Sequence, residues 1–127
     1  MTTTPLTLAA APPAKGPYSA AVRAGDWLVF AGQIGIDPES GALVPGGMEA
    51  EAARIFATLD ALIAEAGATK ADLARVAIFV TDLAQFPPIN EAYEVFLEGA
   101  RPARTTVQVA ALPAGASIEV EIWIHTA

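Results

Sequence analysis

The residues best suited to chemistry lie near the C-terminus, in a segment that alternates apolar and polar side chains. Between residues 117 and 125 every even-numbered position is isoleucine or valine. This alternation is typical of a β-strand with one buried face, and it turns Glu119, Glu121 and Trp123 to the opposite face. Two carboxylates on one sheet face can accept and return protons in general acid–base catalysis.

An arginine is predicted to join these carboxylates from the neighbouring segment, residues 104–109. Val107 and Val109 are expected in the core, which turns Arg104 and Thr106 to the other face. If both segments form strands that pair antiparallel with their core faces matched, Arg104 and Thr106 lie near the two glutamates. A guanidinium in this position can bind a carboxylate through two parallel hydrogen bonds.

Trp123 decides between two interpretations of this sheet face. A solvated face with cross-strand ion pairs would gain only about 0–1 kcal/mol per pair, and it would leave a large indole ring in water. Burial of the face against another subunit would cover Trp123 and partly desolvate Arg104 and the glutamates. The presence of Trp123 favours the second interpretation.

Composition narrows the chemistry to a few residue types. The 127-residue chain has no cysteine and one histidine, His125, which removes disulfides, thiolate nucleophiles and Cys-rich or His-rich metal sites. Its 7 basic residues are scattered and are outnumbered by 14 acidic ones, so the net charge is −7. That balance argues against nucleic acid and anionic membranes as partners. Carboxylates, arginine, tyrosine and backbone groups remain, and no metal is expected.

Periodicity and turn signals predict the elements that position these residues. Apolar residues recur at three- and four-residue steps from Met48 to Ala66, and Pro87-Pro88 suits the start of a helix. This order of elements predicts an α+β domain with both helices on one face of a largely antiparallel sheet. The predicted elements are strands at 18–24 and 27–34, a helix at 48–66, a strand at 73–80, a helix at 86–97, and strands at 104–109 and 117–125.

The length predicts a single domain over residues 1–127. The first fifteen residues lack periodicity and contain three of the ten prolines, so we expect a loosely ordered arm, with regular structure beginning near Gly16. No signal-peptide pattern and no apolar run long enough for a membrane span is visible. A cytoplasmic location is therefore the default expectation.

Six short motifs occur in the order and approximate spacing of a known family. They are Gly16-Pro17-Tyr18-Ser19, Ala31-Gly32-Gln33-Ile34, Val80-Thr81-Asp82-Leu83, Ile89-Asn90-Glu91-Ala92-Tyr93, Pro102-Ala103-Arg104-Thr105-Thr106-Val107 and Ile118-Glu119-Val120-Glu121. With these motifs the chain resembles the Rid family, also called the YjgF or enamine/imine deaminase family, over nearly its whole length after the arm. The resemblance implies a chorismate-mutase-like α+β fold that assembles as a homotrimer, with ligand sites in clefts between subunits.

The same resemblance implies hydrolysis of reactive enamine and imine acids, such as 2-aminoacrylate and 2-iminobutanoate, to 2-keto acids and ammonia. By that similarity Arg104 holds the substrate carboxylate, and Glu119 positions or activates the attacking water. No metal or organic cofactor is needed, because an imine is already electrophilic. The resemblance also implies that Tyr18, Asn90 and the backbone at Gly32 and Thr106 line the cleft. Tyr18, Asn90 and Gly32 have structural interpretations as well, in packing, capping and close strand approach respectively.

The chain departs from the pattern of the best-known deaminases at three positions. Ala31 stands where they often carry serine, Thr106 where they often carry cysteine, and Arg101 where an aromatic residue is common. A relative that acts on an aminomuconate-type or 3-aminoacrylate-type substrate is therefore an alternative. Whether Glu119 or Glu121 carries the proton stays open.

Three further functions are alternatives at this point. A chorismate-mutase-type pericyclic catalyst would need Arg101 beside Arg104 to hold a dicarboxylate. A non-catalytic trimeric protein that binds metabolites or acts like a chaperone would use the same cleft. Ribonuclease activity has also been associated with the family, but the net charge of −7 and the lack of a histidine pair disfavour it.

Overall fold

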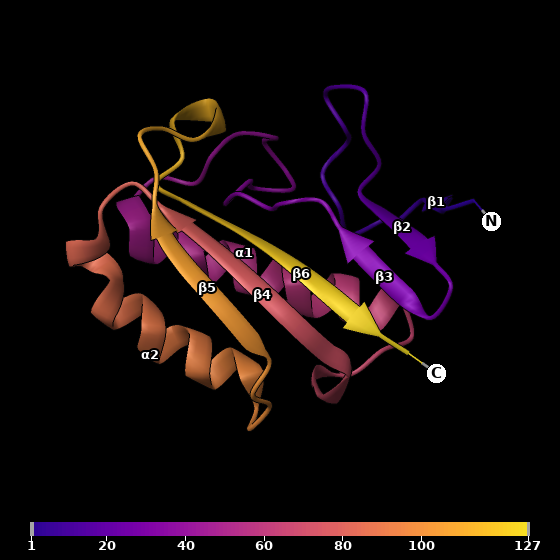
Figure 1. The fold of residues 1–127 in the computed structure, drawn as a ribbon. Coiled ribbons are helices and arrows are strands. Elements are labelled where there is room, and N and C mark those ends of the chain that lie inside the picture. Colours follow the sequence, from indigo (N-terminus) through magenta and orange to yellow (C-terminus); the bar gives the residue numbers. More distant parts are fainter. Residues whose placement is uncertain (1, 127) are drawn as a thin grey trace.

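A computed structural model describes residues 2–126 and contains a six-stranded β-sheet (Figure 1). The order of strands across the sheet is β1-β2-β3-β6-β4-β5, and all neighbouring pairs are antiparallel except β4 and β5. The sheet is therefore mixed but mostly antiparallel, as the sequence predicts. The strands are β1 (Thr4–Leu6), β2 (Ala21–Ala24), β3 (Trp27–Phe30), β4 (Leu73–Val80), β5 (Ala103–Gln108) and β6 (Ile118–His125).

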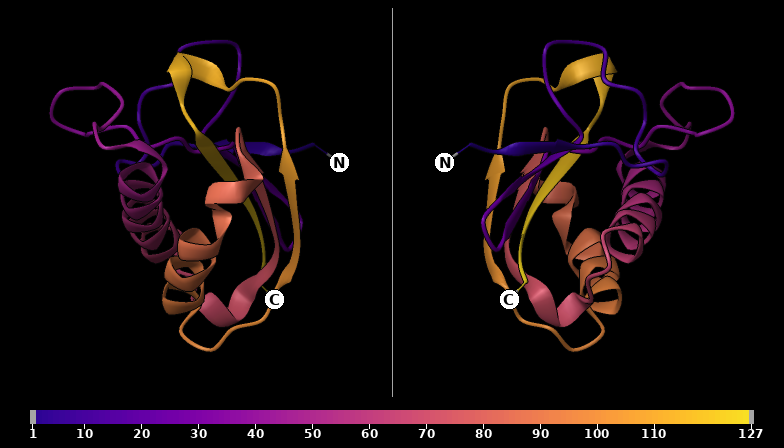
Figure 2. Two further views of the ribbon diagram at one scale, coloured as in Figure 1. Left: turned by 90° about the vertical axis from the view of Figure 1, so that its left-hand side faces the viewer. Right: turned by 90° about the vertical axis from the view of Figure 1, so that its right-hand side faces the viewer.

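Both helices lie on the same face of this sheet, which Figure 2 shows from two sides. Helix α1 spans Gly47–Glu65 and helix α2 spans Phe86–Leu97. Gly67 follows α1 with a φ of +75°, in the left-handed region that glycine adopts readily at helix ends. The bounds predicted for α2 and β4 are confirmed residue for residue, and so is the packing of the helices on one face. No helix within residues 2–126 has both the length and the apolar character needed to cross a membrane.

The core lies between the helices and the sheet. On β6 the even-numbered isoleucines and valine are fully buried, while the residues between them are only partly buried, so the predicted core face of this strand is confirmed. The helices contribute large apolar side chains from one stripe each. These core residues include Ile55, Leu59, Leu62, Ile89 and Phe96 from the helices and Val76, Ile78 and Val80 from β4.

Strand β5 takes a different place from the one that its sequence predicts. It pairs in parallel with β4, which places Arg104 beside Val76 and Thr106 beside Ile78. The cause is the connection through α2, because a helical crossover returns the chain in the same direction along the sheet. The predicted antiparallel pairing of β5 with β6 is therefore wrong.

This pairing also reverses the predicted faces of β5. Residues in register across two strands point to the same side, so Arg104 and Thr106 lie on the helix-covered face. Val107 lies beside Phe79 on the helix-free face and is 39% exposed. The prediction that Val107 enters the core is wrong for the same reason.

The N-terminal segment forms strand pairing and hydrogen bonds that its composition does not predict. Strand β1 pairs with β2 at the edge of the sheet. Farther along, the N–H groups of Ala9 and Ala10 donate to the Glu65 carboxylate at the end of α1, at 2.6 and 2.9 Å. Main-chain pairing of this kind leaves no periodic signal in the side chains. The expectation that the first fifteen residues form a loosely ordered arm stays a prediction.

The predicted N-terminal hairpin is present but has shorter strands. β2 and β3 are joined through Gly25, which has a φ of +61°. The strand expected at 27–34 ends at Phe30, and the chain meets the sheet again at Gln33, which bridges to Val120. This interruption leaves the chain after β3 available to form the wall of a cavity.

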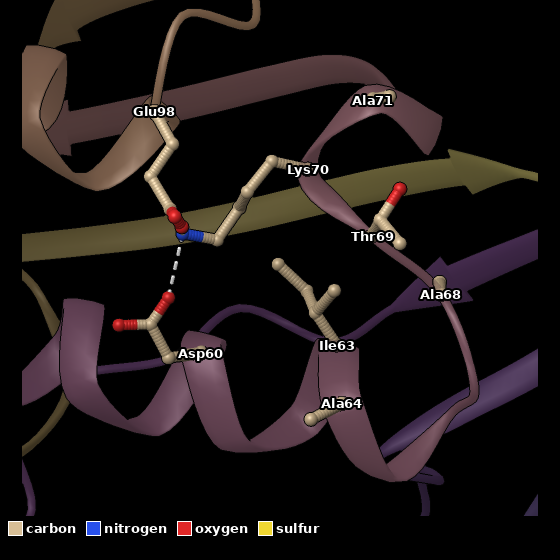
Figure 3. A pocket seen from close by; sticks show the side chains of 8 residues that line it. All are labelled: Asp60, Ile63, Ala64, Ala68, Thr69, Lys70, Ala71 and Glu98. Atoms are coloured by element: carbon tan, nitrogen blue, oxygen red, sulfur yellow. Dashed lines mark hydrogen bonds and ion pairs between the residues drawn. The ribbon is translucent and has the colours of Figure 1, made fainter.

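Lys70 links the two helices through polar contacts and lies beside a cavity of the helix layer (Figure 3). The ammonium of Lys70 lies 2.7 Å from a carboxylate oxygen of Asp60 on α1 and 2.8 Å from one of Glu98, just after α2. It also donates to the Phe96 carbonyl and lies 4.1 Å from the centre of the Phe96 ring. Burial by itself lowers the pKa of Lys70, but hydrogen bonds and attraction from both carboxylates raise it above its usual value. Lys70 therefore keeps its charge, although only 14% of its side chain is exposed.

Replacing Lys70 with methionine is expected to lower the free energy of unfolding by about 1–3 kcal/mol, because hydrogen bonds to charged groups contribute more than exposed ion pairs do. Chemical denaturation followed by circular dichroism measures the change. The contribution is fully present below the ordinary lysine pKa of 10.5 and is lost as the pH rises through the higher folded-state pKa. Lys15→Met is the control, because Lys15 is exposed and forms no ion pair within residues 2–126. Equal denaturation midpoints for the two variants would contradict the prediction.

Candidate functional site

A cavity of about 430 Å³ lies between the N-terminal segment, the chain that follows β3, and the turn that precedes β6. Tyr18, Ala31 and Gly32 line it, together with Pro113 and Ala114 of a short 3₁₀ turn. Tyr18 is 57% exposed, and its hydroxyl accepts a hydrogen bond of 3.4 Å from the Lys15 N–H. The structure thus brings two of the predicted site residues, Tyr18 and Gly32, to one cavity.

A third predicted residue, Glu119, lies directly against Gly32. A β-carbon added at Gly32 would come within 2.8 Å of the Glu119 carboxyl carbon and would overlap one of its oxygens. Only glycine leaves room for the carboxylate here. The approach is fixed by the next residue of each segment, because Gln33 and Val120 exchange two backbone hydrogen bonds of 2.8 and 3.0 Å.

The environment of Glu119 favours its protonated form. Burial raises the pKa of Glu119 above its usual value, and the negative charge of Glu121 raises it further. A carboxyl group with a raised pKa gains and loses its proton closer to neutral pH. Such a group suits proton transfer in a reaction that runs near neutrality.

A second, smaller cavity of about 220 Å³ lies on the helix side of the sheet, between α2 and β5. Arg104 and Asn90 both line it, and the Arg104 guanidinium donates a hydrogen bond of 2.6 Å to the Asn90 side-chain carbonyl. The guanidinium carbon also lies 5.2 Å from the ring centres of Phe86 and Tyr93, where cation–π attraction supports it. No carboxylate within residues 2–126 pairs with Arg104. Its remaining N–H groups can therefore bind an anion.

These two groups of site residues lie on opposite faces of the sheet within one chain. Glu119 is beside Phe79 on the helix-free face, whereas Arg104 points toward α2. The prediction that Arg104 and Thr106 neighbour Glu119 is therefore wrong for a single chain. Thr106 also faces the helix side, where its hydroxyl is buried without a hydrogen-bond partner among the described residues.

The arginine that does share a face with the glutamates is Arg75 of β4. It donates to the Thr105 hydroxyl at 2.8 Å, and its guanidinium carbon lies 5.5 Å from the centre of the Trp123 ring. Sequence reasoning misses Arg75 because it takes β5, instead of β4, as the neighbour of β6. The available signal is the alternation of β4, in which Arg75 precedes the buried Val76.

Other parts of the molecule are weaker candidates for a site. Within residues 2–126 no three His, Cys, Asp or Glu side chains lie close enough to share a metal ion. The cavity of Figure 3 is lined by Lys70, Asp60 and Glu98, whose charges are already paired with one another. The two cavities beside Glu119 and Arg104 remain the best candidates for ligand binding.

Comparison with known proteins identifies the family. A family model described as Endoribonuclease L-PSP matches residues 8–126. The chain belongs to this family, which is the Rid (YjgF) family. The resemblance carried by the six motifs is thereby confirmed.

Relatives of this Rid chain match it over most of their own length. A RutC family protein of Aquifex aeolicus is 43% identical over 114 residues, which are 88% of this chain and 90% of the relative. A mouse protein named 2-iminobutanoate/2-iminopropanoate deaminase is 40% identical over 111 residues, which are 87% of this chain and 82% of the relative. The crystal structure of YyfA from Yersinia pestis, a Rid-family protein of unknown function, has a TM-score of 0.93 at 34% identity and covers 98% of this chain and 100% of that one. This chain therefore shares its fold, two helices on a mixed six-stranded sheet, with solved Rid structures.

Replacing Gly32 with alanine is expected to displace the Glu119 carboxylate without unfolding the protein. The added methyl group overlaps the flexible end of a side chain, which can turn toward solvent, so stability should change by no more than about 1 kcal/mol. The pKa of Glu119 should fall toward its ordinary value as its solvation increases. Carbon-13 NMR of the side-chain carboxyl groups over a pH titration measures this shift.

Gly16→Ala is the control for this substitution, because a β-carbon at Gly16 meets only the Tyr18 ring at an ordinary 3.5 Å. It should leave the titration of Glu119 unchanged. An unaltered Glu119 titration in Gly32→Ala would show that the carboxylate does not occupy the place described above.

Proposed function

We propose that this Rid protein hydrolyses 2-enamine and 2-imine acids of the 2-aminoacrylate and 2-iminobutanoate type to 2-keto acids and ammonia. The observation that carries the proposal is the Glu119 carboxyl group, which lies against Gly32, a lining residue of the larger cavity, and whose pKa is raised. Mouse, rat and bovine relatives that carry the name of such a deaminase are 36–40% identical, and they support the same reaction.

The complete site is proposed to form between copies of the chain in a homotrimer. One chain presents Arg104 and Glu119 on opposite faces of its sheet, so a small imino acid has no route to both within that chain. Arg104 lies on β5, an edge strand with mostly exposed residues, where a second copy can approach. The helix-free face of that copy would bring its own Glu119 to Arg104. This contact would also cover Trp123 and Val107 on the helix-free face of the second copy. Burial of their apolar surface favours association by about 25 cal/mol per Å².

In the proposed reaction Arg104 binds the substrate carboxylate through paired hydrogen bonds, and the Asn90 carbonyl holds the guanidinium in place. A water molecule adds to the electrophilic imine carbon. Glu119 accepts a proton from this water as the carbon–oxygen bond forms and delivers it to the nitrogen. The resulting hydroxyl proton is passed to the nitrogen in the same way, the carbon–nitrogen bond breaks, and ammonia and the 2-keto acid leave.

The same cycle serves an enamine, which first takes a proton at its β-carbon and gives up one from its nitrogen to become the imine. One water is consumed and one ammonia is released for each substrate molecule, so no cofactor takes part. Glu119 is proposed as the proton carrier in preference to Glu121, because Glu119 is the carboxylate that touches the cavity wall at Gly32. Tyr18, which also lines the cavity, would donate a hydrogen bond to orient the water or the nitrogen.

A different amino-enoate is the second candidate substrate. Ala31 supplies no hydroxyl to the cavity, and Ala20 and Ile34 add apolar lining. The part of the substrate that is remote from its carboxylate therefore meets few hydrogen-bonding groups. Substrates of the aminomuconate and 3-aminoacrylate types belong in the same assay.

The wild-type protein is expected to accelerate formation of pyruvate from 2-aminoacrylate that a serine dehydratase generates in situ, with semicarbazide as the competing trap. Arg104→Ala should lower kcat/KM about 30- to 150-fold, which corresponds to about 2–3 kcal/mol for lost hydrogen bonds between charged groups. Arg23→Ala, at an exposed residue of β2, is the control and should behave as wild type.

Each result has a distinct meaning. No acceleration by the wild-type protein on any of these amino-enoates would refute the deaminase proposal and favour a protein that binds metabolites without turning them over. Wild-type activity in Arg104→Ala would leave the reaction intact but refute the role of Arg104 in binding the carboxylate.

A homotrimer should have a mass of about 39 kDa in solution, three times the 13.0 kDa of the chain. Light scattering coupled to size-exclusion chromatography measures this mass. Trp123→Lys should shift the population toward the monomer, because a charge would then have to be buried in the interface. A wild-type mass near 13.0 kDa would refute a site shared between subunits.

A further inference from the structure

Glu51 is a charged residue inside the protein, and the reaction proposed above does not use it. It lies on α1 and is only 4% exposed. Both of its carboxylate oxygens accept hydrogen bonds from Ser117, one from the backbone N–H at 2.8 Å and one from the hydroxyl at 2.9 Å. No basic side chain within residues 2–126 pairs with Glu51. A buried carboxylate is costly unless such bonds satisfy it, so its contact with Ser117 is specific.

Ser117 immediately precedes β6 and lies two residues before Glu119. Its own carbonyl accepts a hydrogen bond of 3.0 Å from the N–H of Thr81, the residue that follows β4. Val120 is held in turn by its two bonds with Gln33. Glu119 therefore lies on a short stretch of backbone that is hydrogen-bonded at Ser117, two residues before it, and at Val120, the residue after it.

The backbone of Glu51 also supports the segment that contains Gly32. A β-carbon at Gly35 would come within 2.8 Å of the Glu51 α-carbon, so this segment lies directly on the first turns of α1. Pro113, which lines the larger cavity, is linked to the same anchor, because its carbonyl accepts a bond of 3.0 Å from Ala116, the residue before Ser117. Two walls of the larger cavity, the chain after β3 and the turn before β6, thus contact or are linked to one residue of α1.

We propose that Glu51 is a positioning residue that holds Glu119 against Gly32 by anchoring Ser117 to α1. Its kinetic consequence rests on the deaminase function proposed above. A hydrophobic contact at this place would bury the strand without setting its position along α1, whereas two hydrogen bonds of defined direction do both. A displacement of a reacting group by about 1 Å can lower a rate about 10²-fold. The loss of Glu51 should therefore affect catalysis without any contact between Glu51 and the substrate.

The test compares Glu51→Ala with Glu51→Gln. Alanine removes both acceptors, and we expect kcat on 2-aminoacrylate to fall about 10- to 100-fold. Glutamine keeps an oxygen for the Ser117 N–H and offers an N–H to the Ser117 hydroxyl, so it should retain kcat within about 3-fold. Glu49→Ala is the matched control on the same helix, because Glu49 is exposed, and it should equal wild type.

A second readout separates this proposal from the deaminase function. Carbon-13 NMR of the Glu119 carboxyl group reports its surroundings whether or not any substrate is turned over. In Glu51→Ala the titration of Glu119 should move away from that of the wild type, and in Glu51→Gln and Glu49→Ala it should not. If the wild-type protein proves inactive, this titration alone decides the positioning role.

The result that would overturn the proposal is a folded Glu51→Ala variant in which both the Glu119 titration and kcat are those of the wild type. If Glu51→Ala does not fold, Ser117→Ala carries the test, because it removes the hydroxyl bond and keeps the backbone bond. That variant should shift the Glu119 titration in the same direction to a smaller extent. An unchanged titration in a folded Ser117→Ala would overturn the proposal equally.

Discussion

The crossover from β4 through α2 to β5 is the constraint on which the proposed site depends. It makes β5 parallel to β4 and puts Arg104 on the helix-covered face, in contact with Asn90. Strand β6 lies on the other side of β4 and turns Glu119 to the opposite face. The group that can bind a carboxylate and the group that can carry a proton are therefore separated by the thickness of a sheet. The proposed reaction uses both groups, and for that reason we place its site between two copies of the chain.

The proton-carrying half of the site needs few components. Gly32 lets the Glu119 carboxylate approach the backbone closely, and burial together with Glu121 makes the protonated form easier to populate. Nothing in this arrangement depends on a thiol or an imidazole, which agrees with a chain that has no cysteine and a single histidine. An imine is electrophilic enough that placement of water and transfer of protons account for the proposed chemistry.

Directional polar contacts complement the apolar core in setting this geometry. Burial of isoleucine, leucine and valine between helices and sheet is largely non-directional and tolerates small shifts of one layer over the other. Lys70 joins α1 to the end of α2, and Glu51 joins α1 to the start of β6. Lys70 has three polar partners and Glu51 accepts two hydrogen bonds from Ser117, so each residue limits how far α1 can slide over the elements that carry the site.

The sequence by itself determined most of the helices and strands and the residue types that are available to the site. Alternation and helical periodicity predicted β4, β6 and α2 closely, and motifs around Arg104 and Glu119 identified the family, because these signals are local along the chain. Only the tertiary structure decided that β5 lies beside β4, that Arg75 faces the glutamates, and that Glu51 anchors Ser117. Alternation shows which side chains of one strand share a face, but the neighbour of that strand depends on contacts between distant segments. No local sequence pattern indicates which strand is the neighbour, so the strand order could be taken only from the tertiary structure.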